Sequence, residues 1–490
     1  MTATITLATM VGYFFILLVV ARLTGGKGGN DDFFRAGRRS PWFLVAFGML
    51  GASVSGVSFV SVPGMVGKID MTYLQMCIGF FVGYIVISAV LLPLYYRLKL
   101  TSIYGYLRMR FGVCSHKTGS VFFLLSKLSG ASARFFLICL VLQRFVFDAV
   151  GMPFVLTILL MLMLTWLYTR RAGIRTLVYT DTLQTVCLLT ALVMVIVLMA
   201  RGMGLDAQGL VKNVSESGYS RVFVFDDWRS TQNFWKQFLS GVFVTIVMTG
   251  LDQDMMQKNL TCKTLAAARK DMCTYGVCFI PLNLLFLVLG VLLYEYAETA
   301  GIAVPAQTDN LLPEVVASGG LGPAVTVLFV LGITSAAFSS VDSALTSLTT
   351  SFCVDMLGIE RRQLGEREAQ SVRKRVHVGV VAVFVVFTLV FKAVNSSSVI
   401  DAIYIMASYT YGPLLGMFAF GLFTRRVPRD KYVPVVCVAS PVVCYVLYAV
   451  VLNATGYRFG YEMLLVNGLL TFVCLLLLSR GRERCAGEKL

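Results

Sequence analysis

Residues 47–64 read FGMLGASVSGVSFVSVPG and form the most informative segment of the chain. Four glycines, four serines and a proline stand there inside an apolar run. Glycine and small hydroxyl side chains weaken the hydrogen-bond ladder of a helix, so the segment predicts a membrane-spanning helix that unwinds near the middle of the bilayer. Backbone carbonyls freed at such a break are able to coordinate a cation. The alternative is that its small residues allow close packing against a neighbouring helix.

The composition around this segment is that of a membrane protein. Of the 490 residues, 57% are hydrophobic and only 14% are charged, and the mean hydropathy is +0.78. A soluble chain has roughly 25% charged residues. The charges gather in short clusters between apolar runs of about the 20 residues that one helical crossing needs. We therefore expect an all-α protein that crosses the lipid bilayer of the cell membrane many times.

Hydropathy over a window of about 19 residues predicts thirteen membrane-spanning helices. The first has no preceding basic region and no cleavage site, so we expect a retained helix rather than a signal peptide. The predicted spans are 4–22, 42–66, 71–96, 118–148, 152–169, 176–200, 236–257, 271–296, 321–356, 378–393, 398–423, 432–452 and 462–479.

The lysines and arginines predict the orientation of these spans. Loops after the odd-numbered spans and the C-terminal tail together hold 31 of the 42 basic residues, whereas the opposite side holds 9. Cytoplasmic loops carry the excess of lysine and arginine in membrane proteins. The N-terminus is therefore expected outside and the C-terminus in the cytoplasm. The net charge of +16 is mainly a signal of this topology.

Several function classes are not expected. Nucleic-acid binding needs a basic face on a folded soluble domain, and no soluble stretch exceeds about 35 residues. The two histidines, His116 and His377, are expected in basic loops, so neither a histidine metal site nor a Ser-His catalytic pair is predicted inside the membrane. The twelve cysteines lie mostly in apolar runs without repeated CxxC, which is typical of packing residues.

The span 321–356 contains the densest polar stretch, TSAAFSSVDSALTSLTTS at residues 334–351, with ten hydroxyl residues and Asp342. Its polar positions at helical spacing form one face with hard oxygen donors, which suits Na⁺. The alternative is that the hydroxyls bond back to carbonyls of their own helix. That face comprises Ala336, Ser339, Ser340 and Ser343.

Three other charges inside predicted spans stand out, because a charge within a membrane helix usually marks a functional site or pathway. Asp181 stands a few residues inside its span, near the cytoplasmic end, where access to water is the alternative explanation. Arg134 is expected either to pair with an acidic neighbour or to present its guanidinium to an anionic substrate. Lys127, seven residues earlier on the same face, is expected to snorkel toward the cytoplasm.

In these residues the chain resembles the sodium:solute symporter family, which includes proline, sugar, sialic-acid and iodide symporters. The resemblance covers nearly the whole chain. It implies a LeuT-like fold in which two five-helix repeats, 42–200 and 236–423, are inverted relative to each other. One extra helix, 4–22, precedes them and two, within 432–479, follow in a single transporter domain of residues 1–490. The broken helices would be 42–66 and 236–257. The matching segments are FRAGRRSPW at 34–42, TSIYGYLRMRFG at 101–112, YTDTLQ at 179–184, GLDQDMMQK at 250–258 and SSVDS at 339–343.

The resemblance also implies cation sites. A primary Na⁺ site would use backbone carbonyls of Gly51, Val54 and Ala336 with the hydroxyls of Ser339 and Ser340. A second Na⁺ site, present in part of the family, would use Asp181, Ser339, Asp342 and Ser343. Several members carry an uncharged hydroxyl at the position of Asp342. This carboxylate would either strengthen the second site or share a proton with Asp181, because two close carboxylates resist double ionisation.

The substrate contacts implied by the resemblance are Ser55, Ser58, Gln75, Arg134 and Thr249. Arg134 falls where sialic-acid carriers have an arginine for the substrate carboxylate, and Ser55 and Ser58 match their hydroxyl positions. This favours an organic anion such as a sialic acid or another carboxylate. A neutral sugar or other neutral solute is the alternative.

Together these observations predict a secondary active symporter that imports a small organic solute with Na⁺, by alternating access. The coupling ions are expected to be one or two Na⁺, and the transport unit a monomer. A membrane-embedded enzyme is less well supported, because no set of acid, base and nucleophile recurs at the membrane surface. A channel would show repeats of a short pore unit, which the chain lacks.

Overall fold

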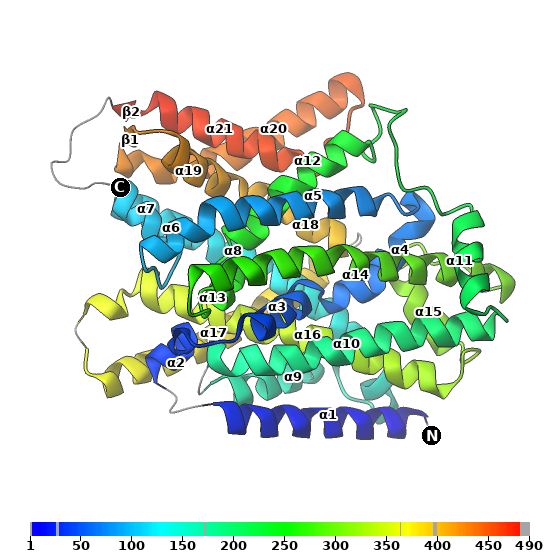
Figure 1. Ribbon diagram of the computed structural model, residues 1–490. Coiled ribbons are helices and arrows are strands. Elements are labelled where there is room, and N and C mark those ends of the chain that lie inside the picture. Colours follow the sequence, from blue (N-terminus) through cyan, green and yellow to red (C-terminus); the bar gives the residue numbers. More distant parts are fainter. Residues whose placement is uncertain (1, 26–28, 171–172, 363, 395–398, 481–490) are drawn as a thin grey trace.

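The computed structural model describes residues 2–25, 29–170, 173–362, 364–394 and 399–480, and these form a bundle of helices (Figure 1). The first half of the chain contains α1 (Thr2–Thr24), α2 (Asn30–Arg35), α3 (Trp42–Ser53), α4 (Gly56–Ile69), α5 (Tyr73–Val86), α6 (Leu92–Arg97), α7 (Gly105–Arg110), α8 (Val113–Leu142), α9 (Phe154–Thr169), α10 (Ile174–Gly202) and α11 (Ala207–Glu216). The second half contains α12 (Phe234–Thr245), α13 (Gln253–Asn259), α14 (Leu265–Thr299), α15 (Leu311–Ala317), α16 (Pro323–Ser351), α17 (Glu366–Val394), α18 (Val399–Thr410), α19 (Gly412–Phe423), α20 (Val433–Thr455) and α21 (Met463–Leu477). Two short strands, β1 (Val427–Pro428) and β2 (Ser479–Arg480), pair antiparallel.

Seven of the described helices are long and apolar enough to cross a membrane, and counting each of four bent helix pairs as one span raises the number to eleven. The chain is therefore a helical protein with seven to eleven candidate spans. The expected cytoplasmic C-terminus falls on residues 481–490, which lie outside the described residues.

Both predicted helix breaks are confirmed. The run 42–66 divides into α3 and α4, whose axes are bent by 56°. The run 236–257 divides where α12, extended by a π-helical turn over Ile246–Gly250, meets α13 at a bend of 69°. A third break, which was not predicted, bends α18 and α19 by 43° on either side of Tyr411.

The glycines of residues 47–64 also serve close packing, so the two interpretations of that segment hold together. A Cβ atom at Gly51 would lie 2.1 Å from the Thr185 hydroxyl, and one at Gly48 would lie 3.2 Å from the Cβ of Asp181. Helix α3 can therefore approach α10 closely only because glycine stands at these positions. The close approach brings the broken end of α3 next to Asp181.

The polar helix α16 lies at the centre of the bundle. All residues from Gly332 to Ser351 are buried, and α16 packs against α10, α8, α3 and α4. Helices α1, α17 and α20 lie at the periphery, where 22%, 17% and 22% of their apolar windows are buried, against 78% for α16. In Figure 1, α1 runs along one side of the bundle and α20 and α21 along the opposite side. The polar face of α16 is thus enclosed by protein.

The expectation that the two histidines lie in loops is wrong. His116 and His377 are buried in α8 and α17, and the ring Nε2 of His116 lies 2.9 Å from Oδ1 of Asp355. Helices α8 and α17 begin before the apolar spans predicted at 118–148 and 378–393, because their polar first turns pack against other helix ends. The described cysteines are all free thiols.

Candidate functional site

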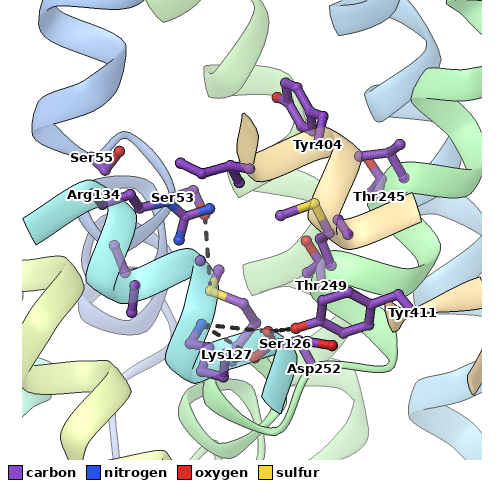
Figure 2. Close-up of a pocket in the computed structure, with 18 of the residues that line it drawn as sticks. Ser53, Ser55, Ser126, Lys127, Arg134, Thr245, Thr249, Asp252, Tyr404 and Tyr411 are labelled. Carbon is purple, nitrogen blue, oxygen red and sulfur yellow. Dashed lines mark hydrogen bonds and ion pairs between the residues drawn. The ribbon is translucent and has the colours of Figure 1, made fainter. Parts of the chain in front are cut away.

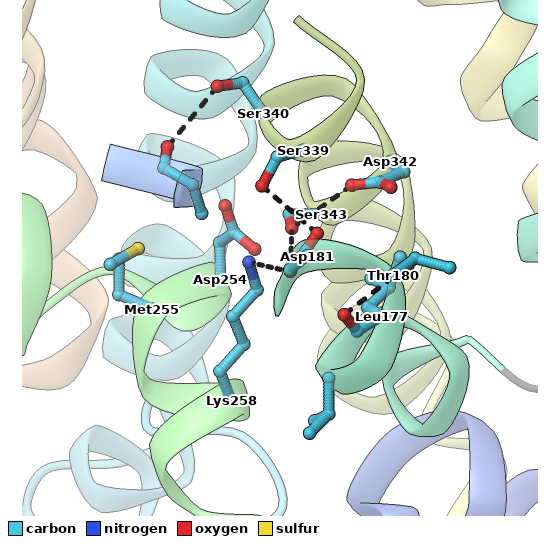
Figure 3. A network of polar contacts seen from close by, with 12 residues as sticks. Leu177, Thr180, Asp181, Asp254, Met255, Lys258, Ser339, Ser340, Asp342 and Ser343 are labelled. Carbon is cyan, nitrogen blue, oxygen red and sulfur yellow. Dashed lines mark hydrogen bonds and ion pairs between the residues drawn. The ribbon is translucent and has the colours of Figure 1, made fainter. Parts of the chain in front are cut away.

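Asp181 of α10 is fully buried and is the centre of a polar cluster against α16 (Figure 3). The hydroxyl of Ser339 donates to its Oδ1 at 3.1 Å, and the hydroxyl of Ser343 lies 3.5 Å from its Oδ2. Ser339 and Ser343 are one helical turn apart, so they present their hydroxyls to the same side. Burial of a carboxylate is tolerated only when it is hydrogen-bonded or paired, and these contacts supply part of that requirement.

Asp342 lies beside this cluster and is also buried. Its Oδ2 accepts a 2.8 Å hydrogen bond from the hydroxyl of Tyr168, and its Oδ1 lies 3.4 Å from the hydroxyl of Ser343. The structure therefore brings together the four residues expected at a second cation site. Ser339 donates to Asp181, Tyr168 donates to Asp342, and the hydroxyl of Ser343 contacts both carboxylates.

Lys258 adds a positive charge that was not predicted at this place. Its Nζ lies 2.6 Å from Oδ2 of Asp181, and only 2% of the Lys258 side chain is exposed. The lysine extends from the last turns of α13 toward α10 (Figure 3). In the sequence it follows the predicted span 236–257, and the orientation prediction places it in a cytoplasmic loop. The segment GLDQDMMQK was the one signal that set it apart from an ordinary loop lysine.

The residues expected at the primary cation site lie where α16 meets the break of α3. The hydroxyl of Ser340 lies 3.2 Å from the carbonyl oxygen of Ala336 and 3.3 Å from that of Ala52. Gly51 is in the last turn of α3, and Val54 follows its end with φ −82° and ψ 84°. The last carbonyls of a helix have no partner in a following turn, so this end of α3 offers acceptor oxygens. Ala52, which was not predicted, supplies the carbonyl that Ser340 contacts.

Other hydroxyls of α16 follow the alternative interpretation. Thr349 donates to the carbonyl of Leu345 at 2.6 Å, and Thr350 donates to that of Thr346 at 2.8 Å. These hydroxyls therefore donate to backbone carbonyls of their own helix, as serine and threonine often do in membrane helices. Their oxygens also contact His377 of α17 and Gln257 of α13. Near the middle of α16, Ser339 and Ser343 contact Asp181 of α10, and Ser340 contacts the carbonyl of Ala52 in α3.

A cavity lies between the broken helix α3–α4, the broken helix α12–α13, and helices α8 and α18 (Figure 2). Four of the five predicted substrate residues line it: Ser55, Ser58, Arg134 and Thr249. Gln75 lies elsewhere, because its amide nitrogen donates to the carbonyls of Thr72 and Gln232 and its Oε1 accepts from the backbone of Val224. Its amide therefore holds the start of α5 to the segment that follows α11.

Arg134 projects from α8 into this cavity, on the side of Ser53 and Ser55 (Figure 2). Within the ranges that the structure describes, its guanidinium forms no ion pair with an acidic side chain. Nearby, α4 begins at Gly56 without a side-chain cap from Ser55, and in its first turn the backbone N–H of Ser58 donates to the carbonyl of Ser55 at 2.9 Å. The partial positive charge of a helix N-terminus favours anions.

Lys127 does not snorkel, and that expectation is wrong. Its Nζ lies 2.6 Å from Oδ2 of Asp254 and 3.4 Å from Oδ2 of Asp252. Asp252 caps the N-terminus of α13 by accepting from the backbone N–H of Asp254, and it also accepts a 2.6 Å hydrogen bond from the hydroxyl of Tyr411. Two acidic residues after the break thus hold Lys127 inside the bundle.

Aromatic side chains of the cavity wall were also missed. The hydroxyl of Tyr275 lies 2.5 Å from that of Ser53 and accepts from Tyr84 at 2.9 Å. Tyr404 and Tyr411 line the wall from α18 and its break. These tyrosines lie in apolar spans far apart in the sequence, so no spacing could have grouped them.

Broken helices that meet at a cavity, with polar groups gathered at the breaks, define the class of membrane protein that binds its cargo near the bilayer midplane and transports it. The chain belongs to the sodium:solute symporter family, whose sequence model matches residues 33–430. The family consists of sodium-coupled transporters. The chain is therefore a Na⁺-coupled symporter of the cell membrane and not an enzyme.

The chain is similar to two bacterial sialic acid symporters. It is 26% identical to the sodium/sialic acid symporter NanT of Aliivibrio fischeri, with 90% of this chain and 87% of the relative covered. It is 23% identical to the sodium/sialic acid symporter SiaT of Proteus mirabilis, with 95% and 94% covered. Among solved structures, a Na⁺-coupled sialic acid symporter in a substrate-bound outward-open state superimposes with a TM-score of 0.81 at 21% identity, over 96% of this chain and 97% of the other. This likeness shows the shared fold.

Proposed function

We propose that this symporter imports an organic anion, a sialic acid or another carboxylate, together with Na⁺ by alternating access. The observation that carries the proposal is Arg134, a half-buried guanidinium in the cavity wall without an acidic partner among the described side chains. An arginine placed between apolar helices is costly unless an anion neutralises it. Its planar fork matches a carboxylate with two parallel hydrogen bonds.

The cavity around Arg134 supports the same solute class. The N-terminus of α4 and the hydroxyls of Ser55 and Ser58 add donors on the side of the guanidinium. Tyr404 and Thr249 contribute hydroxyl groups to other parts of the wall, which suit a polyhydroxylated solute. The similarity to sialic acid symporters agrees with a solute that carries both a carboxylate and hydroxyl groups. A neutral sugar would use the hydroxyl groups and leave Arg134 unpaired.

The primary Na⁺ is proposed to bind at the carbonyls of Gly51, Val54 and Ala336 and the hydroxyls of Ser339 and Ser340. Hard oxygen ligands without a full negative charge suit a sodium ion that is released in each cycle. The contact of the Ser340 hydroxyl with the carbonyl oxygen of Ala52 supports this placement, because it joins α16 to the broken end of α3. A cation there would favour the conformation in which these two elements stay together. Ion and solute would then raise each other's affinity by the same factor.

For the topology we propose thirteen spans, with the N-terminus outside and the C-terminus in the cytoplasm. Helix α8 has 30 residues, enough to cross the bilayer alone, so α9 is counted as a separate span, and α21 completes the number. The basic helix α7, with Arg108 and Arg110, lies at one end of the bundle, and α11, with one lysine, lies at the other, which supports the orientation (Figure 1). We assign the inverted repeats to 42–200 and 236–423, with 4–22 and 432–479 outside them. The transport unit is proposed to be one chain.

The test is uptake into proteoliposomes that contain the purified protein. N-acetylneuraminic acid, lactate and galactose represent a sialic acid, a simple carboxylate and a neutral sugar. We expect uptake of a carboxylate that requires an inward Na⁺ gradient and is lost when K⁺ replaces Na⁺ outside. Sodium-dependent uptake of galactose without uptake of either acid would reject the anionic solute and favour the neutral alternative.

A further inference from the structure

We propose that Lys258 is a built-in cation that takes the place of a second sodium ion, so that the symporter binds one Na⁺ per cycle. This inference rests on the proposed function. It concerns the cluster of Asp181, Asp342, Ser339 and Ser343, which would otherwise form the second cation site.

The geometry places the ammonium where a cation would bind. Nζ of Lys258 lies 2.6 Å from Oδ2 of Asp181, a contact distance of a charge-assisted hydrogen bond. The carboxylates that interact electrostatically with Lys258 are Asp181, Asp254 and Asp342. Both carboxylates expected at the second site therefore already lie in the field of a fixed positive charge.

The remaining oxygens of this cluster have protein partners. Oδ1 of Asp181 accepts from Ser339, and Asp342 accepts from Tyr168. A sodium ion entering the cluster would have to displace the ammonium from Asp181 or approach it closely. Like charges at such a distance in a buried site repel strongly, so binding of Na⁺ and the pairing of Lys258 exclude each other.

The position of Lys258 in the fold keeps its charge in the cluster. It is the sixth residue of α13, the short helix that begins at the break capped by Asp252, and its side chain is 2% exposed. Helices α13 and α16 pack against each other. The lysine thus tethers α13 to Asp181 of α10, whereas a sodium ion at the second site would join α10 to α16.

The test counts the sodium ions bound by the purified full-length protein, with ²²Na⁺ alone as the probe. We expect about one Na⁺ per chain and a Hill coefficient of about 1 for the wild type. Lys258→Met removes the charge at similar length and leaves Asp181 unpaired. The number of Na⁺ bound per chain of this variant is therefore expected to rise toward two. Lys258→Arg and the charge-matched double variant Lys258→Met/Asp181→Asn should both stay at about one.

Two bound ions in the wild type would overturn the inference while leaving the proposed function intact. So would a count of one in a folded, sodium-binding Lys258→Met variant. If that variant does not fold, the neutral variant Lys258→Gln decides instead: a count that rises above one supports the inference, and a count of one overturns it. A wild-type protein that binds no Na⁺ overturns the proposed function, and this inference with it.

Discussion

The hydroxyl of Tyr411 donates a 2.6 Å hydrogen bond to Oδ2 of Asp252, and both residues stand at helix breaks. Tyr411 separates α18 from α19, and Asp252 is the cap that starts α13. The bond therefore joins two breaks beside the cavity, although the two residues are 159 positions apart in the chain.

Tyr411→Phe removes this donor from a buried carboxylate and keeps the ring. We expect a loss of about 1.5–3 kcal/mol of stability, typical of hydrogen bonds to charged groups, and a lower thermal midpoint in detergent. Tyr445→Phe is the control, because the Tyr445 side chain is exposed. Equal midpoints for Tyr411→Phe and the wild type would show that the link between the breaks does not stabilise the fold.

Arg134→Gln should selectively weaken binding of the transported carboxylate. Loss of a charge-assisted hydrogen bond worth about 1.5–3 kcal/mol predicts a KM for N-acetylneuraminic acid that is roughly 10- to 150-fold higher. Binding of ²²Na⁺ without solute should remain unchanged. Arg144→Gln, an exposed arginine just beyond α8, controls for the general loss of positive charge. An unaltered KM in Arg134→Gln would remove the guanidinium from the solute site.

Ser340→Ala should raise the Na⁺ concentration that gives half-maximal uptake, because the hydroxyl is one of five proposed ligand oxygens. A single neutral ligand is worth about 0.5–1.5 kcal/mol, which predicts roughly a 2- to 12-fold increase. Ser347→Ala is the matched control on the same helix, since the Ser347 hydroxyl bonds to the carbonyl of Ala344. The same sodium dependence in both variants would exclude Ser340 from the ion site.

Gly51→Ala should destabilise the protein by overpacking. The added Cβ would lie 2.1 Å from the Thr185 hydroxyl, and such crowding in a packed core costs about 1–3 kcal/mol. The double variant Gly51→Ala/Thr185→Ala is expected to regain part of the thermal midpoint. Gly379→Ala in α17 meets no atom within 4 Å and serves as the control. A Gly51→Ala protein as stable as the wild type would mean that α3 and α10 can separate without cost.

The sequence predicted the parts of this fold that depend on local composition. The break after Ser53 follows from clustered glycines and serines, and the polar face of α16 from hydroxyls at helical spacing. The break at Tyr411 has no comparable local signal beyond the Gly-Pro pair that follows it.

Partners across the bundle were predicted less well, because they depend on which helices pack together. The sequence alone predicts Lys258 to be a loop charge, because its pairing with Asp181 depends on how α13 packs in the bundle. Lys127 seemed close enough to the cytoplasm to reach water, but the acidic start of α13 holds it inside. Gln75 matched a substrate position by resemblance, whereas its amide is used by the outer segment around Val224.

The ion pair between Lys258 and Asp181 has a consequence for the energy source of transport. If the chain supplies one of its own cations, a cycle moves one Na⁺ and one carboxylate, and the net charge that crosses the membrane is zero. The membrane potential, worth about 2.3 kcal/mol per charge and 100 mV, then adds nothing to accumulation. Uptake of a monocarboxylate would be set by the ratio of sodium concentrations alone, and a potassium diffusion potential imposed with valinomycin would leave its extent unchanged.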